Sequence, residues 1–370
     1  MATMPELPDH ARAMVLTAVR ELELQTFPLP QIGPDDGFLR MEVCGICGSD
    51  YEQFNGEFAS NFPTIPGHEP VGRIAALGER AAERWGVSVG DLVSVEPGVR
   101  CGQCRNCREG EGRRCVNGAG YGYTLTDRAP ALWGGYAEYM YLHPATVMHP
   151  MPNDLPPRLA ALYNPLGAGF AWAVAAAGLT VGQSVAVLGS GQRGLCSIIA
   201  ARAAGAGTIV ATGLSRDEHK LALAREFGAD LTLNAETEPV VERVLEATGG
   251  RGVDVVVDVT PYATQPVADA MRMAKRGGTV VLAGLKGSHR VPDFNSDDIV
   301  TRQLTVKGVL GVDHQSFRRA IDLILSGRFP LERLHSHAFR LENAEEAIAT
   351  LAGETSEAAI NVTIEPWLDD

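Results

Sequence analysis

Hydrophobic positions change their pattern near residue 160, and the change predicts two domains. Before it, short apolar and β-branched runs such as AMVLTAV (13–19) and FLRMEVCG (38–45) alternate with glycine, proline and polar turns. Such runs predict short strands and a mainly β domain. The same pattern recurs in VGRIAALG (71–78), DLVSVEPG (91–98) and YAEYMYL (136–142).

After residue 160 the pattern predicts helices and buried strands in alternation. The alanine-rich segment 159–179 predicts a helix, and from Ser184 uninterrupted apolar strands alternate with amphipathic helices. That alternation is typical of a parallel sheet covered on both faces, so the fold class is α/β with a doubly wound second domain. Further along the chain, the pattern predicts helices over residues 314–327 and 343–353 and a closing strand in AAINVTI. We expect domains at 1–163 and 164–308, with 309–370 returning to the first domain.

Length and charge narrow the classes of function. A chain of 370 residues exceeds one ordinary core. A net charge of −13 and a pI near 5.2 argue against nucleic acid or an anionic membrane as the main partner. No apolar run approaches the length of a membrane span, and the N-terminus lacks the shape of a signal peptide. We expect a cytoplasmic protein that acts on a small molecule.

A glycine-rich loop predicts a dinucleotide site. VAVLGSGQRGL places Gly189, Gly191 and Gly194 in the pattern G-x-G-x-x-G, with Gln192 and Arg193 between the last two glycines. The loop follows a predicted strand and begins a predicted helix, which is the context this motif requires. The helix N-terminus then faces the pyrophosphate. All five residues are candidate cofactor contacts.

The next strand bears on the choice between NAD and NADP. An NAD site usually ends this strand with Asp or Glu, about 20 residues past the glycines, to bind the ribose 2′-hydroxyl. Here TIVATGLSR has Gly213 in that place, followed by Ser215 and Arg216. The missing acid removes a repulsion of a 2′-phosphate, and Ser215 with Arg216 could bind one. The pattern favours NADP over NAD.

Four clustered cysteines predict a metal site. CGQCRNCREGEGRRC holds Cys101, Cys104, Cys107 and Cys115 within a polar loop. Four thiolates at this spacing suit a closed, structural zinc site, whereas an iron–sulfur cluster would leave the spacing of the fourth cysteine unexplained. We expect a zinc-stabilised lobe over residues 96–118.

A second group of residues suits an open zinc site. CGICGSD (44–50) supplies a cysteine, and IPGHEP supplies His68 and Glu69 in a turn marked by glycine and proline. One thiolate, one imidazole and one carboxylate leave the fourth position of a tetrahedral zinc to water or substrate. The residues alone do not say which cysteine serves.

With these motifs together, the chain resembles the zinc-containing medium-chain dehydrogenase/reductase family, and the sorbitol or polyol dehydrogenase branch most. The resemblance spans nearly the whole chain and implies a GroES-like catalytic domain followed by a Rossmann domain. It rests on GICGSD (45–50), PGHEPVGRI (66–74), VGDLVSVEPGVRCGQCRNCREG (89–110), WGGYAEY (133–139), GSGQRG (189–194) and KRGGTVVLAG (275–284).

The resemblance also implies roles for single residues. It makes Cys47 the catalytic zinc ligand with His68 and Glu69, and Cys44 a neighbour. Ser49 would pass the substrate proton and Asp50 would support the site from behind the ligands. Two zinc ions per chain are implied, one of which activates the substrate oxygen for hydride transfer between a polyol or other secondary alcohol and NAD(P). Leu285 would lie near the nicotinamide, and relatives assemble as dimers or tetramers.

Three positions depart from the family pattern. Asn164 stands where relatives have Glu or Cys beside the catalytic zinc, Glu52 where many have a relay histidine, and Asn361 where a Lys or Arg often lies near the cofactor phosphates. Asn164 could bond a water but brings no negative charge to the metal. Two other functions therefore stay open, a zinc-free quinone or alkene reductase and a non-catalytic nucleotide-binding protein.

Overall fold

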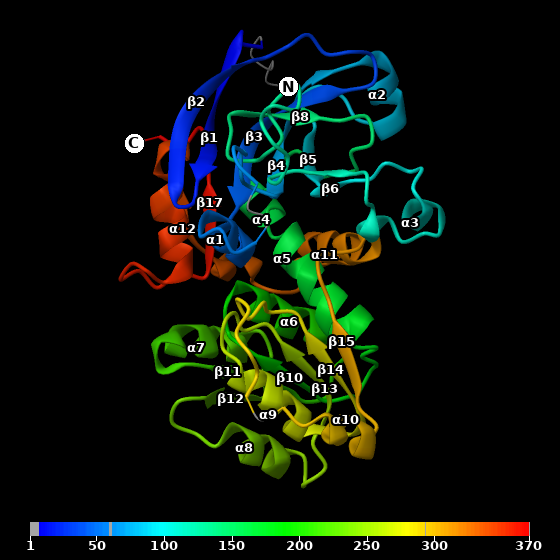
Figure 1. Cartoon of the computed structure of the whole chain (residues 1–370), viewed down its shortest axis with the longest axis vertical. Helices are drawn as coiled ribbons and strands as arrows, with labels where there is room; N and C mark the ends of the chain where they lie inside the picture. Colours follow the sequence, from blue (N-terminus) through cyan, green and yellow to red (C-terminus); the bar gives the residue numbers. More distant parts are fainter. Residues whose placement is uncertain (1–6, 59–60, 293, 370) are drawn as a thin grey trace. The chain divides into compact units, whose positions relative to one another are not determined.

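The chain folds into two compact units. The computed structural model describes residues 7–58, 61–292 and 294–369, and the units comprise residues 1–162 with 331–370, and 163–330 (Figure 1). The sequence placed the return to the first domain at residue 309, whereas the structure places it at Leu331. Helix α11 (His314–Ser326) stays with unit 2 because its Phe317 ring packs on Tyr163, with ring centroids 5.5 Å apart.

The core of unit 1 is a predominantly antiparallel sheet with the strand order β16-β17-β3-β4-β5-β9, and β8 pairs with β3. All five strands predicted before residue 160 are present, as β1, β3, β4, β5 and β8, and the predicted closing strand is β17. The sheet strands are β3 (Gly37–Gly45), β4 (Glu69–Leu77), β5 (Leu92–Val95), β8 (Tyr139–Leu142), β9 (Met148–Pro150), β16 (His335–Phe339) and β17 (Asn361–Ile364). The other strands and helices of unit 1 are β1 (His10–Ala18), β2 (Glu21–Pro28), β6 (Gly98–Val99), β7 (Ala119–Gly120), α1 (Gly48–Phe54), α2 (Glu79–Trp85), α3 (Arg105–Arg108), α4 (Pro157–Ala160) and α12 (Ala344–Ala352).

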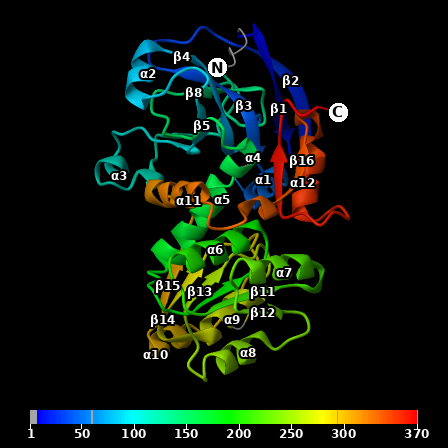
Figure 2. The ribbon, with the colours of Figure 1, turned by 180° about the vertical axis from the view of Figure 1, so that it is seen from behind.

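The returning segment completes this sheet. Strand β17 pairs with β3 so that Thr363 faces Gly45, and the backbone of Ile46 donates to the carbonyl of Val362 (2.9 Å). Figure 2 shows α12 beside β17 at the red end of the chain. The last part of the sequence therefore supports the strand that leads into CGICGSD.

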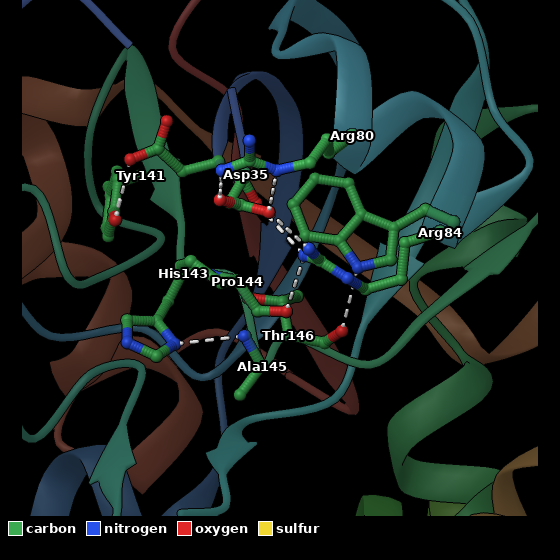
Figure 3. A network of polar contacts seen from close by, with 10 residues as sticks. Asp35, Arg80, Arg84, Tyr141, His143, Pro144, Ala145 and Thr146 are labelled. Carbon is green, nitrogen blue, oxygen red and sulfur yellow. Dashed lines mark hydrogen bonds and ion pairs between the residues drawn. The ribbon is translucent and has the colours of Figure 1, made fainter. Parts of the chain in front are cut away.

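A polar network ties α2 to two loops of unit 1 (Figure 3). The Asp35 carboxylate pairs with Arg80 and Arg84, and these guanidinium groups hold its pKa at about 2. Arg84 also donates to the carbonyl of Pro144 (3.1 Å), and the Tyr141 hydroxyl donates to Asp36 (3.1 Å). The network is solvent-accessible, and we assign it a supporting role for the loops around β8.

Unit 2 contains the parallel sheet that the sequence predicts. Its strand order is β12-β11-β10-β13-β14-β15, with all neighbours parallel and helices on both faces. The order reverses between β10 and β13, so a ligand crevice is expected at the carboxyl ends of these strands. The strands are β10 (Val185–Leu188), β11 (Ile209–Gly213), β12 (Leu231–Asn234), β13 (Val253–Asp258), β14 (Ala274–Leu282) and β15 (Thr305–Gly308). The helices are α5 (Tyr163–Gly169), α6 (Gln192–Ala203), α7 (Glu218–Glu226), α8 (Val240–Ala247), α9 (Gln265–Met273), α10 (Ser296–Arg302) and α11.

The predicted alanine-rich helix is present but irregular. It comprises α4, α5 and a π-helical segment, Phe170–Ala176. Residues 157–176 are long and apolar enough to cross a membrane, yet 72% of the most apolar window is buried inside the protein. Such burial is typical of a core helix of a folded domain.

Candidate functional site

Three residues of unit 1 converge as the sequence predicts. The ligand atoms of Cys47, His68 and Glu69 all lie within 4.8 Å of one another, and all three residues are buried. Cys47 precedes the first residue of α1, while His68 and Glu69 stand at the start of β4. A Cβ at position 45 would lie 2.5 Å from a carboxylate oxygen of Glu69, so Gly45 leaves the room that this carboxylate occupies. The fold thus brings the two sequence motifs together.

Asp50 fixes the orientation of this group. One of its carboxylate oxygens lies 3.1 Å from His68 Nδ1, and the other accepts from the backbone N–H of Cys47 (2.7 Å). When Nδ1 donates to Asp50, the lone pair of the imidazole is at Nε2, which is the atom that can bind a metal. Ser49 Oγ lies 3.4 Å from Nε2, on the same side. The arrangement fits a zinc ligand with a carboxylate partner behind it.

The pKa values of His68 and of Glu52 are both raised, for different reasons. Burial alone lowers the pKa of His68, but Asp50, Tyr123 and Cys47 outweigh it, so the pKa is raised well above its usual value. Burial raises the pKa of Glu52 to about 7, with further contributions from the charges of Cys47, Glu57 and Asp50. Glu52 lies on α1 with Ser49, so a carboxyl group that can exchange protons near neutral pH stands on the same helix.

Cys44 differs from Cys47 in its surroundings. It lies on β3, fully buried, and burial raises the pKa of its thiol. Its sulfur is packed closely against Gly67 and Gly135, where an added Cβ would come within 2.9 Å and 2.5 Å. A buried thiol in contact with backbone is a core residue.

Tyr123 is a residue of this group that the sequence did not single out. Its hydroxyl lies 3.2 Å from His68 Nδ1, and the two rings pack with their centroids 5.3 Å apart. Burial raises the pKa of Tyr123 to about 12, so it stays a neutral phenol. Nothing in the spacing of GYGY within the sequence points to His68, because the contact is made through the fold.

Replacing Asp50 with asparagine is expected to weaken zinc binding at Cys47, His68 and Glu69 by roughly 10–100-fold, since an amide no longer holds the imidazole as a carboxylate does. The measurement is a chelator competition that reports the two classes of zinc separately. Asp9→Asn, at an exposed position, is the matched control and should leave both affinities as they are. An unchanged affinity in Asp50→Asn would show that Asp50 does not support the ligand.

The four-cysteine lobe forms a second convergent group. The sulfur atoms of the four cysteines lie within 4.8 Å of one another, and Cys104 and Cys115 are 3.9 Å apart. Four sulfurs at about 2.3 Å from one zinc would be separated by about 3.8 Å, so the lobe suits a single ion better than a larger cluster. No disulfide joins any cysteine in the part of the chain that the structure describes.

Backbone N–H groups support the sulfurs of the lobe. The N–H of Cys101 donates to the sulfur of Cys115, and the N–H of Cys104 donates to that of Cys101, each at 3.3 Å. Backbone donors, of Cys107 first, lower the pKa of Cys104 to about 6, and the N–H of Cys101 lowers that of Cys115. Burial has the opposite effect on Cys107, whose pKa rises to about 12. The lowered pKa values of Cys104 and Cys115 favour the thiolate, which is the form that binds a metal.

The glycine loop of unit 2 has the geometry that a dinucleotide requires. Gly189 has φ +102°, in the left-handed region, and a Cβ at Gly194 would lie 1.8 Å from the carbonyl oxygen of Gly189. Around Gly191, which precedes α6, nothing lies within 4 Å of an added Cβ. The strand, the turn and the helix N-terminus are thus in place for a pyrophosphate.

The side chains of three predicted cofactor residues, Gln192, Arg193 and Leu285, differ in their burial and in their contacts. Gln192 is buried at the start of α6, and Leu285, in the loop after β14, is 43% exposed. Arg193 donates to the backbone carbonyl (3.0 Å) and the side-chain oxygen (3.1 Å) of Asn164, and lies over the ring of Trp172. In unit 2, therefore, the guanidinium of Arg193 holds α5, and the carboxamide oxygen of Asn164 faces that cation.

Comparisons with known proteins agree with these sites. Residues 33–153 match the model of the alcohol dehydrogenase GroES-like domain, and residues 194–326 match that of the zinc-binding dehydrogenases. A protein of Mycobacterium tuberculosis described as a probable alcohol dehydrogenase is 50% identical over 348 residues, which cover 93% of this chain and 95% of that one. The sorbitol dehydrogenase of Bacillus subtilis is 30% identical over 348 residues, covering 92% of this chain and 94% of its own.

Solved structures agree in fold. A protein of Sinorhizobium meliloti described as a zinc-binding dehydrogenase, solved with NADP bound, superposes with a TM-score of 0.86 at 30% identity. The match covers 97% of this chain and 100% of that one. The predicted two-domain α/β class, a GroES-like domain with a Rossmann-type sheet, is confirmed.

Proposed function

Because the chain belongs to the zinc-containing alcohol dehydrogenases of the medium-chain dehydrogenase/reductase family, we propose that it transfers hydride reversibly between a polyol or another secondary alcohol and NAD(P). Its class is that of an NAD(P)-dependent oxidoreductase acting on alcohols. The observation that carries the proposal is the convergence of Cys47, His68 and Glu69 within 4.8 Å. The sorbitol dehydrogenase of Bacillus subtilis supports a polyol as the substrate class.

We propose two zinc ions per chain, with separate roles. Cys47, His68 and Glu69 would hold one, and Cys101, Cys104, Cys107 and Cys115 the other. Four thiolates leave no open position, so the lobe zinc is structural. When bound to the three-residue group, zinc supplies Lewis-acid chemistry that lowers the pKa of an alcohol oxygen.

The residues of this chain handle the proton. Oxidation of the alcohol removes a hydride from carbon, which reduces the nicotinamide, and a proton from oxygen. We propose that Ser49 Oγ, which stands 3.4 Å from His68 Nε2, accepts that proton while it releases its own hydroxyl proton. Glu52, with a pKa of about 7, can take up or release a proton at neutral pH on the same helix.

The cofactor is proposed to bind at the glycine loop of unit 2, with contacts from Gly189, Gly191 and Gly194. Ser215 and Arg216 favour NADP, since a hydroxyl and a guanidinium suit a 2′-phosphate. The NADP in the Sinorhizobium meliloti structure supports this choice. We further propose a cytoplasmic protein, because the N-terminus lacks the pattern of a signal peptide, and a homodimer or homotetramer, because members of the family that the chain resembles assemble in these forms.

The test is zinc per chain, measured by elemental mass spectrometry on protein purified without a chelator, together with turnover of secondary alcohols and ketones with NAD and NADP. Two zinc ions and turnover are expected. One zinc ion, unchanged after zinc is added, would contradict the zinc-dependent mechanism. It would favour instead a zinc-free quinone or alkene reductase, or a nucleotide-binding protein without catalysis.

A further inference from the structure

An acid at the end of β11, where NAD sites usually place one, would crowd the glycine loop. A Cβ added at Gly213 would lie 2.5 Å from the hydroxyl oxygen of Ser190 and 3.1 Å from a methyl group of Leu221. Ser190, the second residue of the glycine loop, is only 2% exposed. Within the described residues its hydroxyl has no hydrogen-bond partner. The absence of an acid at position 213 is therefore built into the packing of the loop.

A carboxylate reaches the loop that follows β11 from the neighbouring strand. Glu236 follows β12, and its carboxylate accepts from the backbone N–H of Ser215 (2.7 Å). The loop is held there, because the N–H of Ala235 donates to the carbonyl of Gly213 (2.8 Å) and the side chain of Asn234 donates to Ser215 Oγ (3.0 Å). Hydrogen bonds from Ser215, side chain first and then backbone, lower the pKa of Glu236, with a further contribution from Arg216. Glu236 is thus a carboxylate that faces Ser215 at neutral pH.

We propose that Glu236 is a specificity-determining residue for the cofactor, supplying from the β12 loop the negative charge that Gly213 lacks. The N–H of Ser215 and the charge of Arg216 are the groups that a 2′-phosphate would use. Glu236 already accepts a hydrogen bond from that N–H, and the charge of Arg216 acts on its carboxylate. A ribose 2′-hydroxyl can donate to the carboxylate, whereas a 2′-phosphate is repelled until the side chain turns away. Because Glu236 is exposed, it can turn outward, so it restrains NADP binding without blocking it.

The inference rests on the proposed function only in requiring that a nicotinamide dinucleotide binds at this sheet edge, so it is tested by binding rather than turnover. Isothermal titration of the full-length protein compares adenosine 5′-monophosphate with adenosine 2′,5′-bisphosphate, in the natural chain and in Glu236→Gln. Removing the charge is expected to tighten the bisphosphate about tenfold, or about 1.4 kcal/mol, with the monophosphate unchanged.

Two further variants sharpen the comparison. Arg216→Ala is expected to weaken the bisphosphate and leave the monophosphate as it was, because it removes a partner of the 2′-phosphate alone. Glu242→Gln, on α8, removes a negative charge from an exposed position of the same unit and is the matched control. It should change neither affinity.

The outcomes separate the two proposals. If Glu236→Gln tightens both ligands equally, or changes neither, Glu236 does not discriminate between them and the inference is wrong, while the proposed function stands. If neither ligand binds the natural chain at all, the dinucleotide site is wrong, and both proposals fall together. A change in the ratio of the two affinities confined to Glu236→Gln and Arg216→Ala is the supporting result.

Discussion

Cys47→Ala is expected to lower kcat/KM for alcohol oxidation by about a thousandfold and to reduce the zinc content from two ions per chain to one. The Lewis acid accounts for several kcal/mol of transition-state stabilisation, and each 1.36 kcal/mol is a factor of ten in rate. Cys47 supplies the thiolate of the convergent group, whose other members are His68 and Glu69. Steady-state kinetics and elemental mass spectrometry of the same preparation measure both effects.

The chain offers a matched control three residues away. Cys44 is also a buried cysteine, but its sulfur packs against Gly67 and Gly135 in the core. Cys44→Ala should therefore retain both zinc ions and most of the turnover, at the cost of a small cavity. Equal losses in the two variants would indicate a general structural defect. Full activity in Cys47→Ala would show that this group is not the catalytic centre.

The comparison of Cys44 with Cys47 also shows where sequence reasoning reached its limit. The spacing of CGICGSD does not distinguish a strand residue from the residue that begins a helix, so the choice rested on the family resemblance. In the structure, β3 ends at Gly45, which buries Cys44 in the sheet, and Cys47 precedes α1. The spacing of the glycine loop is enough to predict its backbone geometry. The roles of Cys44 and Cys47 depend instead on where β3 ends, which the spacing of the two cysteines does not show.

The strands that the sequence missed have a physical reason too. The predicted strands are apolar runs whose residues face the core, as β10 and β13 do. Strand β15 is an edge strand with mostly exposed residues, and β16 reads HSHAF, so neither has the periodic apolar pattern. Such edge strands form because their backbone pairs with the neighbouring strand, and their own side chains give little sign of it in the sequence.

Residues that act through long-range contacts were the hardest to predict. Tyr123 reaches His68 across 55 positions of the chain, and Glu236 reaches Ser215 across 21. In each case the contact depends on the pairing of strands or the path of a loop, for which the sequence carries no fixed spacing. The two convergent groups of cysteine, histidine and glutamate residues could be found in the sequence because cysteine and histidine are rare and lie clustered there, which is a signal that a lone Tyr or Glu does not provide.

Replacing Lys286 with methionine is expected to destabilise unit 2 by about 3–5 kcal/mol, the cost of leaving a buried carboxylate without its partner. Lys286 Nζ lies 2.8 Å from Asp258, and their side chains are 13% and 0% exposed. The same ammonium donates to the carbonyl and the hydroxyl of Thr260 (2.5 Å and 3.0 Å), so it joins the loops that follow β13 and β14. Equilibrium unfolding in urea measures the loss.

The double variant Lys286→Met/Asp258→Asn tests whether the loss of stability in Lys286→Met comes from the unpaired charge of Asp258. Asn keeps a side-chain oxygen for the N–H of Thr260, which Asp258 now accepts at 3.0 Å, but carries no charge to be left unpaired. It should therefore recover a large part of the stability that the single variant loses. A loss below about 1 kcal/mol in Lys286→Met would mean that solvent reaches Asp258 and the pair contributes little. Because Asp258 ends β13 beside β10, at the reversal of strand order, recovery of stability without recovery of cofactor affinity would assign the pair of Lys286 and Asp258 a direct part in shaping the dinucleotide site.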